Sequence, residues 1–417
     1  MDRRDRHERI ETGRVMNVLG VYISVPFCKA KCTFCNFASD AFAPGRMEGY
    51  TRRLCREIAD SRAYAARLGT SLPRRIDSIY FGGGTPSLLE PAQIEAIFHQ
   101  LRAEFEIEPD AEMTLECAPG QLSNGTLDQL LRQGLNRISF GIQSFVDRES
   151  AAVGRLHTRE ICLTEIERVR AAGIKEVNID LIAGLPLQTE ASWRYSVDQA
   201  ISAGSKHVSI YMLEVDEESR LGREALAHGQ RYHAGEMPTE DQIAAWYQIA
   251  CDLLADGDVH QYEISNFARE GSRSRHNLKY WQCHPYLGFG LDAHSMLLTA
   301  TGAVRMANPD NLDLYLAEPA ASGLLPMRSS MPTFDVIGGD AAFEESLFLG
   351  LRLSEGLSLS TVRAKHGDAL VRATLPALEE LCEAGLLEID AERIKLTGRG
   401  RLLSNEVFSR ILISAPA

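Results

Sequence analysis

The chain lacks the features that mark membrane-spanning, secreted or nucleic-acid-coating proteins. No run among its 417 residues approaches eighteen consecutive apolar residues, so we expect no spanning segment. Lys and Arg (44) are outnumbered by Asp and Glu (57), and the net charge of −13 predicts no nonspecific nucleic-acid binding. The first fourteen residues are mostly charged and contain no apolar stretch, so we expect residues 1–16 to be a mobile tail and not a secretory signal.

The chain lacks the cysteine spacing of a disulfide framework. Six of the nine cysteines are scattered singly, whereas Cys28, Cys32 and Cys35 lie in one short segment. Three thiolates with no fourth ligand nearby do not suit a structural zinc ion, although zinc or simple burial remains an alternative. They suit an iron–sulfur cluster that keeps one iron open. Because such a cluster needs a reducing compartment, we expect a cytoplasmic protein.

Short β-rich runs alternate with helix-like segments from residue 17 to about residue 214. The predicted strands cover residues 18–25, 77–81, 112–117, 136–140, 176–182 and 207–213. The predicted helices cover residues 47–68, 91–104, 126–133, 159–172 and 192–203. This alternation predicts an α/β fold with parallel strands. Six repeats are too few for a closed eight-fold barrel, so we expect a partial (β/α)6 barrel.

Polar residues follow the predicted strands at the points where each strand ends. A glycine-rich segment follows the second strand, Glu116 closes the third, Gln143 follows the fourth and Asp180 lies near the end of the fifth. In barrels of this kind the site lies at the carboxyl ends of the strands. A carboxylate beside apolar strands costs several kcal/mol unless it is paired or bound to a ligand. The sequence leaves both possibilities open, with Arg137 or Arg155 as ion-pair partners.

The remainder of the chain divides into two further regions. Residues 231–340 are less regular and form an expected connecting region, which contains His276-Asn-Leu-Lys-Tyr280-Trp281. Residues 341–417 predict three helices, a small hairpin and a last helix, an order that resembles a winged helix. This span is acidic, so we expect a structural cap and not a DNA-binding module. The barrel core then covers residues 17–230.

The cysteine segment and its aromatic neighbours resemble the radical SAM superfamily, in which S-adenosylmethionine (SAM) fills the open iron of a [4Fe-4S] cluster. Longer stretches resemble the oxygen-independent coproporphyrinogen III oxidase family, and within it the HemW branch of heme chaperones. These stretches cover residues 80–87, 136–144, 178–186, 262–266, 276–281 and 396–405.

The resemblance implies roles for individual residues. Cys28, Cys32 and Cys35 would hold the cluster. The SAM contacts would be Tyr22, Phe34, Gly83, Gly84, Thr85, Glu116, Gln143, Arg155 and Asp180. His276 becomes a candidate heme ligand, although a lone histidine is more often structural. The implied partners are heme or a porphyrin, a reductant protein and an unidentified heme acceptor; no catalytic residue is assigned.

The branch of the family decides the expected function. Oxidases of the family carry a fourth cysteine where this chain has Phe37, and a longer N-terminal arm than the residues that precede Tyr22 here. The His-Asn-x-x-Tyr-Trp element is associated with the heme chaperone branch. We therefore expect heme binding and transfer. The alternatives are an oxygen-independent coproporphyrinogen III oxidase, or a related radical SAM methyltransferase or heme-modifying enzyme. Cys283-His284 is an additional candidate heme-ligand pair or a surface loop.

Overall fold

A twelve-stranded sheet forms the centre of the computed structural model, which describes residues 17–43, 45–299, 302–317 and 333–412. The expected tail over residues 1–16 lies outside the described residues. Six parallel strands pair in chain order in the middle of the sheet. They are β1 (Val18–Val25), β2 (Arg75–Gly83), β3 (Glu106–Cys117), β4 (Arg137–Gln143), β5 (Glu176–Ala183) and β6 (His207–Met212). The predicted partial barrel of six parallel strands is confirmed.

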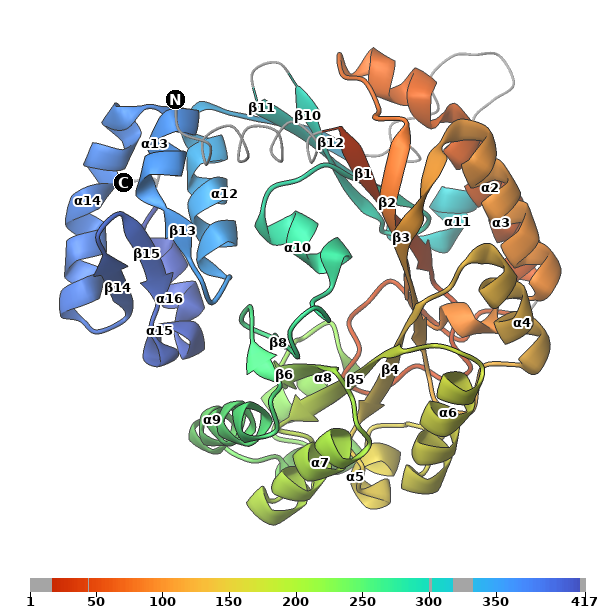
Figure 1. The fold of residues 1–417 in the computed structure, drawn as a ribbon. Coiled ribbons are helices and arrows are strands. Elements are labelled where there is room, and N and C mark those ends of the chain that lie inside the picture. Colours follow the sequence, from red (N-terminus) through yellow and green to blue (C-terminus); the bar gives the residue numbers. More distant parts are fainter. Residues whose placement is uncertain (1–16, 44, 300–301, 318–332, 413–417) are drawn as a thin grey trace.

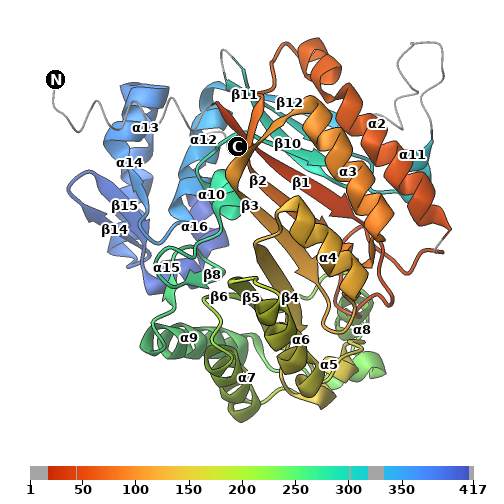
Figure 2. The same cartoon turned by 45° about the vertical axis from the view of Figure 1, so that its right-hand side comes forward.

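Helices connect these strands and cover the outer face of the sheet (Figure 2). They are α2 (Arg46–Arg67), the short 3-10 helix η1 (Pro86–Leu88), α3 (Pro91–Glu104), α4 (Asn124–Gln133), α5 (Asp147–Ala152), α6 (Arg159–Ala171) and α7 (Glu190–Ser202). Hydroxyl side chains cap the N-termini of several of these helices. Ser123, Thr158 and Thr189 each accept a hydrogen bond from a backbone N–H of the first helical turn.

Strands from residues 260–338 extend the sheet at both edges, which the βα alternation did not predict. At one edge β9 (Tyr286–Phe289) pairs parallel to β1 and is followed by antiparallel β10 (His294–Thr299), β11 (Gly302–Ala307) and β12 (Thr333–Gly338). At the other edge, β8 (Asn266–Ala268) and β7 (His260–Gln261) pair antiparallel. The intervening helical elements are α8 (Arg220–Leu226), η2 (Arg231–Glu236), α9 (Glu240–Asp256) and α11 (Leu312–Leu316).

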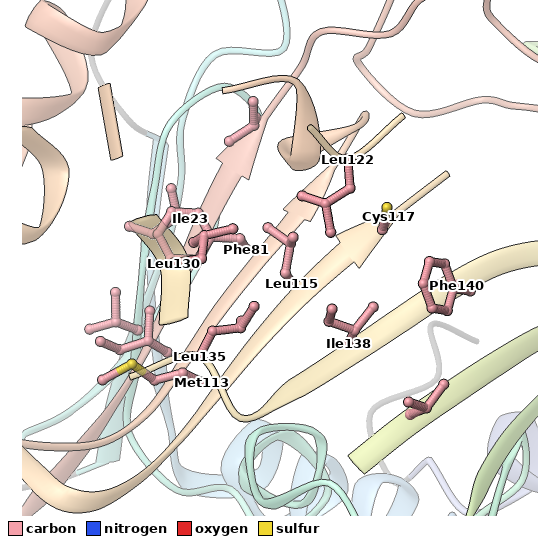
Figure 3. Packing of buried hydrophobic residues seen from close by; sticks show 14 of the residues in the cluster. Ile23, Phe81, Met113, Leu115, Cys117, Leu122, Leu130, Leu135, Ile138 and Phe140 are labelled. Atoms are coloured by element: carbon pink, nitrogen blue, oxygen red, sulfur yellow. The ribbon is translucent and has the colours of Figure 1, made fainter. Parts of the chain in front are cut away.

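The main core lies between the parallel strands and their covering helices. Ile23, Phe81, Leu115 and Ile138 are buried and lie level with one another on β1 to β4, so they form one apolar row across the sheet (Figure 3). Side chains alternate between the two faces of a strand. The residues next to this row therefore point to the interior of the barrel, which places polar and aromatic side chains there.

The C-terminal part is mainly helical, as the sequence predicts, and packs around a second apolar cluster. It contains α12 (Gly339–Leu351), α13 (Leu359–His366), α14 (Asp368–Glu383), α15 (Gly398–Leu402) and α16 (Ser404–Arg410). A small antiparallel sheet joins them, in the order β13 (Leu357–Ser358), β15 (Arg393–Leu396), β14 (Leu387–Asp390). Within the described residues, none of the helices in either part combines the length and the apolarity needed to cross a bilayer.

Helix α10 (Arg275–Trp281) lies on the concave side of the sheet and carries the His-Asn-x-x-Tyr-Trp element (Figure 1). Its start is held by the buried carboxylate of Glu112 on β3. One oxygen accepts from the backbone N–H of His276 (3.0 Å) and the other from that of Arg275 (3.0 Å). The buried Arg137 lies 3.8 Å from the same carboxylate. Lys279 pairs with Asp77 at 2.9 Å, which fixes α10 against β2.

Replacement of Glu112 should destabilise the protein strongly, because Arg137 and the first amides of α10 would lose their buried partner. We expect Glu112→Ala to lower the free energy of unfolding by about 3–5 kcal/mol. Glu48→Ala is the control, since its carboxylate forms an exposed ion pair with Arg52, and it should change stability by less than about 0.5 kcal/mol. Urea unfolding followed by circular dichroism measures both changes. Equal stability of the two variants would contradict this account of α10.

Candidate functional site

The three clustered cysteines lie in a loop that follows β1. The backbone N–H of Cys35 donates to the carbonyl of Cys32 (3.3 Å), and that of Cys28 donates to the carbonyl of Asp40 (3.0 Å). These bonds fold the loop into a compact turn. All three thiols are partly buried and free of disulfides. Burial raises the pKa values of the Cys28 and Cys35 thiols.

A pocket of about 330 Å³ brings the cysteines together with most of the polar residues singled out in the sequence. It lies at the carboxyl ends of the parallel strands. Its lining includes Cys28, Cys32, Phe34, Cys35, Gly83, Gly84, Thr85, Glu116, Gln143, Arg155 and Asp180. Tyr22 does not line this pocket and instead faces a second pocket beside it. The expected convergence of one polar group per strand on a single rim is therefore present.

The glycine-rich segment binds the cysteine loop through its backbone. The N–H of Gly84 donates to the carbonyl of Val25, and that of Thr85 to the carbonyl of Phe27, each at 2.8 Å. A Cβ atom at Gly84 would lie 2.8 Å from that Val25 oxygen, so only glycine permits this approach. The Thr85 hydroxyl then donates to the sulfur of Cys28 at 3.7 Å.

Arg155 links the cysteine loop to the end of β4. One guanidinium nitrogen donates to the sulfur of Cys32 at 3.3 Å, and another donates to the backbone carbonyl of Gly141. Arg137 faces Glu112 and the carbonyl of Ser272 instead. The ion pair between Arg137 or Arg155 and the site carboxylates, one explanation that the sequence left open, does not occur among the contacts of the described residues.

Glu116 and Asp180 are half-buried and lack a cationic hydrogen-bond partner within the described part of the chain. Burial, with the nearby charge of Asp180, raises the pKa of Glu116 to about 7. The Tyr80 hydroxyl donates to Glu116 at 3.0 Å. Asp180 accepts from Ser139 (3.1 Å) and Asn178 (2.7 Å), while burial raises its pKa as well. A positively charged ligand between the two carboxyl groups would lower both pKa values.

Gln143 is the residue whose backbone and side chain most directly indicate a ligand. It is the last residue of β4 and adopts φ = 71°, a left-handed conformation that non-glycine residues seldom adopt. Its side-chain oxygen is buried without a hydrogen-bond partner. Buried polar atoms are normally satisfied, so an unpaired oxygen on this pocket is available to a ligand donor.

His276 lies below the pocket and is fully occupied by protein contacts. Its Nδ1 hydrogen-bonds with the Ser78 hydroxyl (3.0 Å) and its Nε2 with the Tyr280 hydroxyl (2.9 Å). Its ring stacks on Tyr80, with ring centroids 5.3 Å apart. Burial, with the charge of Lys279, lowers its pKa to about 3. In this conformation neither ring nitrogen is available to heme iron, so heme ligation by His276 would require Tyr280 or Ser78 to move.

The structure adds interior residues that motif reasoning missed. Ser139, Asn178 and Ser209 surround Asp180 and hydrogen-bond with one another across β4, β5 and β6. Tyr80 connects α10 to the pocket, because it stacks on His276 and donates to Glu116. The available signal was the two-residue alternation of each strand, which places Asn178 and Asp180 on one face.

The side chains present are compatible with a thiolate-held cluster, although no set of three His, Cys, Asp or Glu side chains in the described residues is arranged to hold a single metal ion. A cluster of four irons is larger than one ion, and the three thiols line one pocket without converging on a single position. Thr85 and Arg155 direct donors at two of the sulfurs, and thiolate sulfurs accept such bonds in iron–sulfur sites.

Comparisons with known proteins cover nearly the entire chain. Residues 22–200 match the Radical SAM superfamily, and residues 339–403 match the HemN C-terminal domain. The heme chaperone HemW of Bacillus subtilis is 32% identical, over 94% of this chain and 98% of its own length. Its counterpart from Mycobacterium tuberculosis (strain CDC 1551 / Oshkosh) is 33% identical over 94% of each chain. The structure of coproporphyrinogen III oxidase (HemN) from Escherichia coli, a radical SAM enzyme, superimposes with a TM-score of 0.79 at 22% identity. It covers 96% of this chain and 91% of its own, a likeness of fold.

The carboxyl group of Glu116 should titrate near pH 7 in the protein without bound cofactors. We expect its infrared carbonyl band to vanish as the pH rises through about 7, and Glu116→Gln identifies the band. Asp180→Asn should shift the transition to lower pH, because it removes a neighbouring negative charge. Since the unfolded chain releases this proton at lower pH, the contribution of Glu116 to stability should fall between about pH 4.5 and 7. A band unaffected by Asp180→Asn would contradict the coupling.

Proposed function

This chain belongs to the HemW family of radical SAM proteins, and we propose that it binds heme and transfers it to an acceptor protein. The observation that carries the proposal is the length of the similarity. It extends over 98% of a heme chaperone, and therefore includes the barrel, α10 and the C-terminal part together. A match to the barrel alone would support only the superfamily.

The proposed cofactors are a [4Fe-4S] cluster and SAM, both at the carboxyl edge of the parallel strands. Cys28, Cys32 and Cys35 would bind three irons and leave the fourth for the amino and carboxylate groups of SAM. Reduction of such a centre supplies one electron for cleavage of SAM, and the protein positions and shields it. Thr85 and Arg155 would donate to the ligating sulfurs, which favours a more reducible cluster.

The remaining lining residues would bind SAM itself. The backbone of Gly83 and Gly84 allows close approach, while Glu116 and Asp180 provide negative charge for the ammonium or hydroxyl groups. The unpaired oxygen of Gln143 would accept from a ribose hydroxyl. Phe34 lines the same pocket with an apolar ring. Tyr22 would contribute to SAM binding from the side of the neighbouring pocket, which it lines, and its ring stacks on that of Tyr80.

Residue 37 favours the chaperone over the oxidase. Oxidases that this chain resembles have a fourth cysteine there, whereas Phe37 presents a ring that is 64% exposed and lines both pockets.

A reductant protein and a heme acceptor remain proposed partners. We also propose that residues 17–230 form the radical SAM core, 231–340 a connecting region and 341–417 a winged-helix-like cap. Thiolate ligation of a cluster supports a cytoplasmic location.

Removal of any one proposed cluster ligand should abolish the cluster. We expect Cys28→Ala, Cys32→Ala and Cys35→Ala each to lose the visible absorbance and bound iron of the reconstituted protein, because each thiolate is the sole protein ligand of its iron. Cys251→Ala is the matched control, since Cys251 is also partly buried but lies outside the pocket. Iron and sulfide analysis measures the loss. A full complement of iron in Cys32→Ala would refute the assignment.

Heme binding and oxidase activity can be separated in one preparation. We expect the reconstituted protein to bind heme stoichiometrically, seen as a Soret band in a titration. Incubated anaerobically with coproporphyrinogen III, SAM and a reductant, it should yield no protoporphyrinogen IX by chromatography. Heme binding should persist in Cys32→Ala, which tests binding apart from the cluster. Multiple-turnover decarboxylation by the wild type would overturn the chaperone proposal in favour of the oxidase.

A further inference from the structure

A second pocket of about 440 Å³ adjoins the cysteine-lined pocket, and none of the three cysteines lines it. The two pockets share Phe37, Ser39, Gly83, Gly84 and Glu116, so a molecule in either pocket would lie against the same residues. Its volume lies within the roughly 300–1,000 Å³ range of small-molecule sites.

Aromatic side chains form much of the wall of this pocket. Tyr22 and Phe37 contribute from β1 and the cysteine loop, while Tyr280 and Tyr286 contribute from α10 and β9. Large exposed apolar side chains that border a cavity mark binding sites, and Phe37 is such a side chain. Flat rings favour a flat, conjugated ligand, because aromatic faces and edges pack well against each other.

His294 lines the same pocket from the first residue of β10 and is held there by its backbone. A Cβ atom at residue 288 would lie 2.2 Å from the carbonyl oxygen of His294, so Gly288 permits close packing of the two segments. The preceding loop is tied by hydrogen bonds from Asp292 N–H to the Pro309 carbonyl (2.9 Å) and from Asn308 N–H to the Ala293 carbonyl (3.0 Å). The imidazole itself is 65% exposed, and its Nε2 lies 3.8 Å from Asp292, beyond hydrogen-bond distance.

The other groups of this pocket that could bind iron are less available. The Tyr280 hydroxyl is engaged with His276, and the Tyr286 hydroxyl accepts from Arg305 at 3.1 Å. Burial raises the pKa of Tyr22, so its phenol stays protonated. His157, in the neighbouring pocket, is buried and hydrogen-bonds through Nε2 to the carbonyl of Ile142 (3.1 Å). Among the described residues that line either pocket, the imidazole of His294 is therefore the accessible nitrogen ligand.

We propose that His294 is the axial ligand of heme iron, and that the macrocycle lies in the pocket formed by Tyr22, Phe37, Tyr280 and Tyr286. This inference rests on the proposed function and deepens it by naming the heme site. Tyr280 of the His-Asn-x-x-Tyr-Trp element then contributes a wall of the site, and His276 supports that wall through its hydrogen bond to the Tyr280 hydroxyl. Heme is the cargo here and would lie beside the pocket proposed for SAM.

The test is a heme titration of the full-length reconstituted protein, read by Soret position, affinity and electron paramagnetic resonance. We expect His294→Ala to shift the Soret band, change the iron spin state and weaken heme binding by about tenfold or more. Added imidazole should restore the wild-type spectrum, because it supplies the missing nitrogen without a peptide link. A purely structural role of His294 would not produce this rescue.

His260→Ala is the matched control. His260 is 64% exposed and stands two residues after Asp258, as His294 stands two residues after Asp292, but it lies outside the heme pocket proposed here. It should leave the spectrum and the affinity unchanged. If the wild type binds heme and His294→Ala retains the same Soret band, or if only His276→Ala changes it, the ligand assignment is overturned while the chaperone proposal stands. Absence of heme binding by the wild type would overturn both.

Discussion

Two short backbone hydrogen bonds hold the site of this protein together. The carbonyls of Val25 and Phe27 accept from the amides of Gly84 and Thr85, which forces the cysteine loop of β1 against the glycine-rich loop of β2. Only residues without a side chain allow this approach at Gly84. The position of Thr85 beside Cys28, and of both loops beside Glu116, follows from that contact.

The interior of the barrel is polar where most cores are apolar, and its polar groups form a connected path. Glu112 fixes α10, and His276 of α10 stacks on Tyr80. Tyr80 then donates to Glu116 at the shared boundary of the two pockets. Buried carboxyl groups without cationic partners cost stability, and proteins retain such violations at functional sites. This path gives the His-Asn-x-x-Tyr-Trp element a structural connection to the pocket where we propose that SAM binds.

The position of α10 also changes what its motif means. The family resemblance makes His276 a candidate heme ligand, whereas in the fold both of its ring nitrogens are satisfied by Ser78 and Tyr280. The exposed imidazole on the adjoining pocket belongs to His294, which lies outside the His-Asn-x-x-Tyr-Trp element. Spacing in the sequence reports which residues are near one another in the chain, but not which nitrogen atoms remain without partners.

The sequence by itself determined the six βα units, the cysteine loop and the polar residue at the end of each strand, because these depend on local alternation and short spacing. The helical C-terminal part followed from the same local patterns. Tertiary structure alone decided the added strands β9 to β12 and β7 to β8, since they pair with partners far along the chain. It also decided that Arg137 pairs with Glu112, that Arg155 donates to the sulfur of Cys32 and that the side-chain oxygen of Gln143 has no hydrogen-bond partner. Such contacts depend on the approach of distant side chains in three dimensions, which no local pattern encodes.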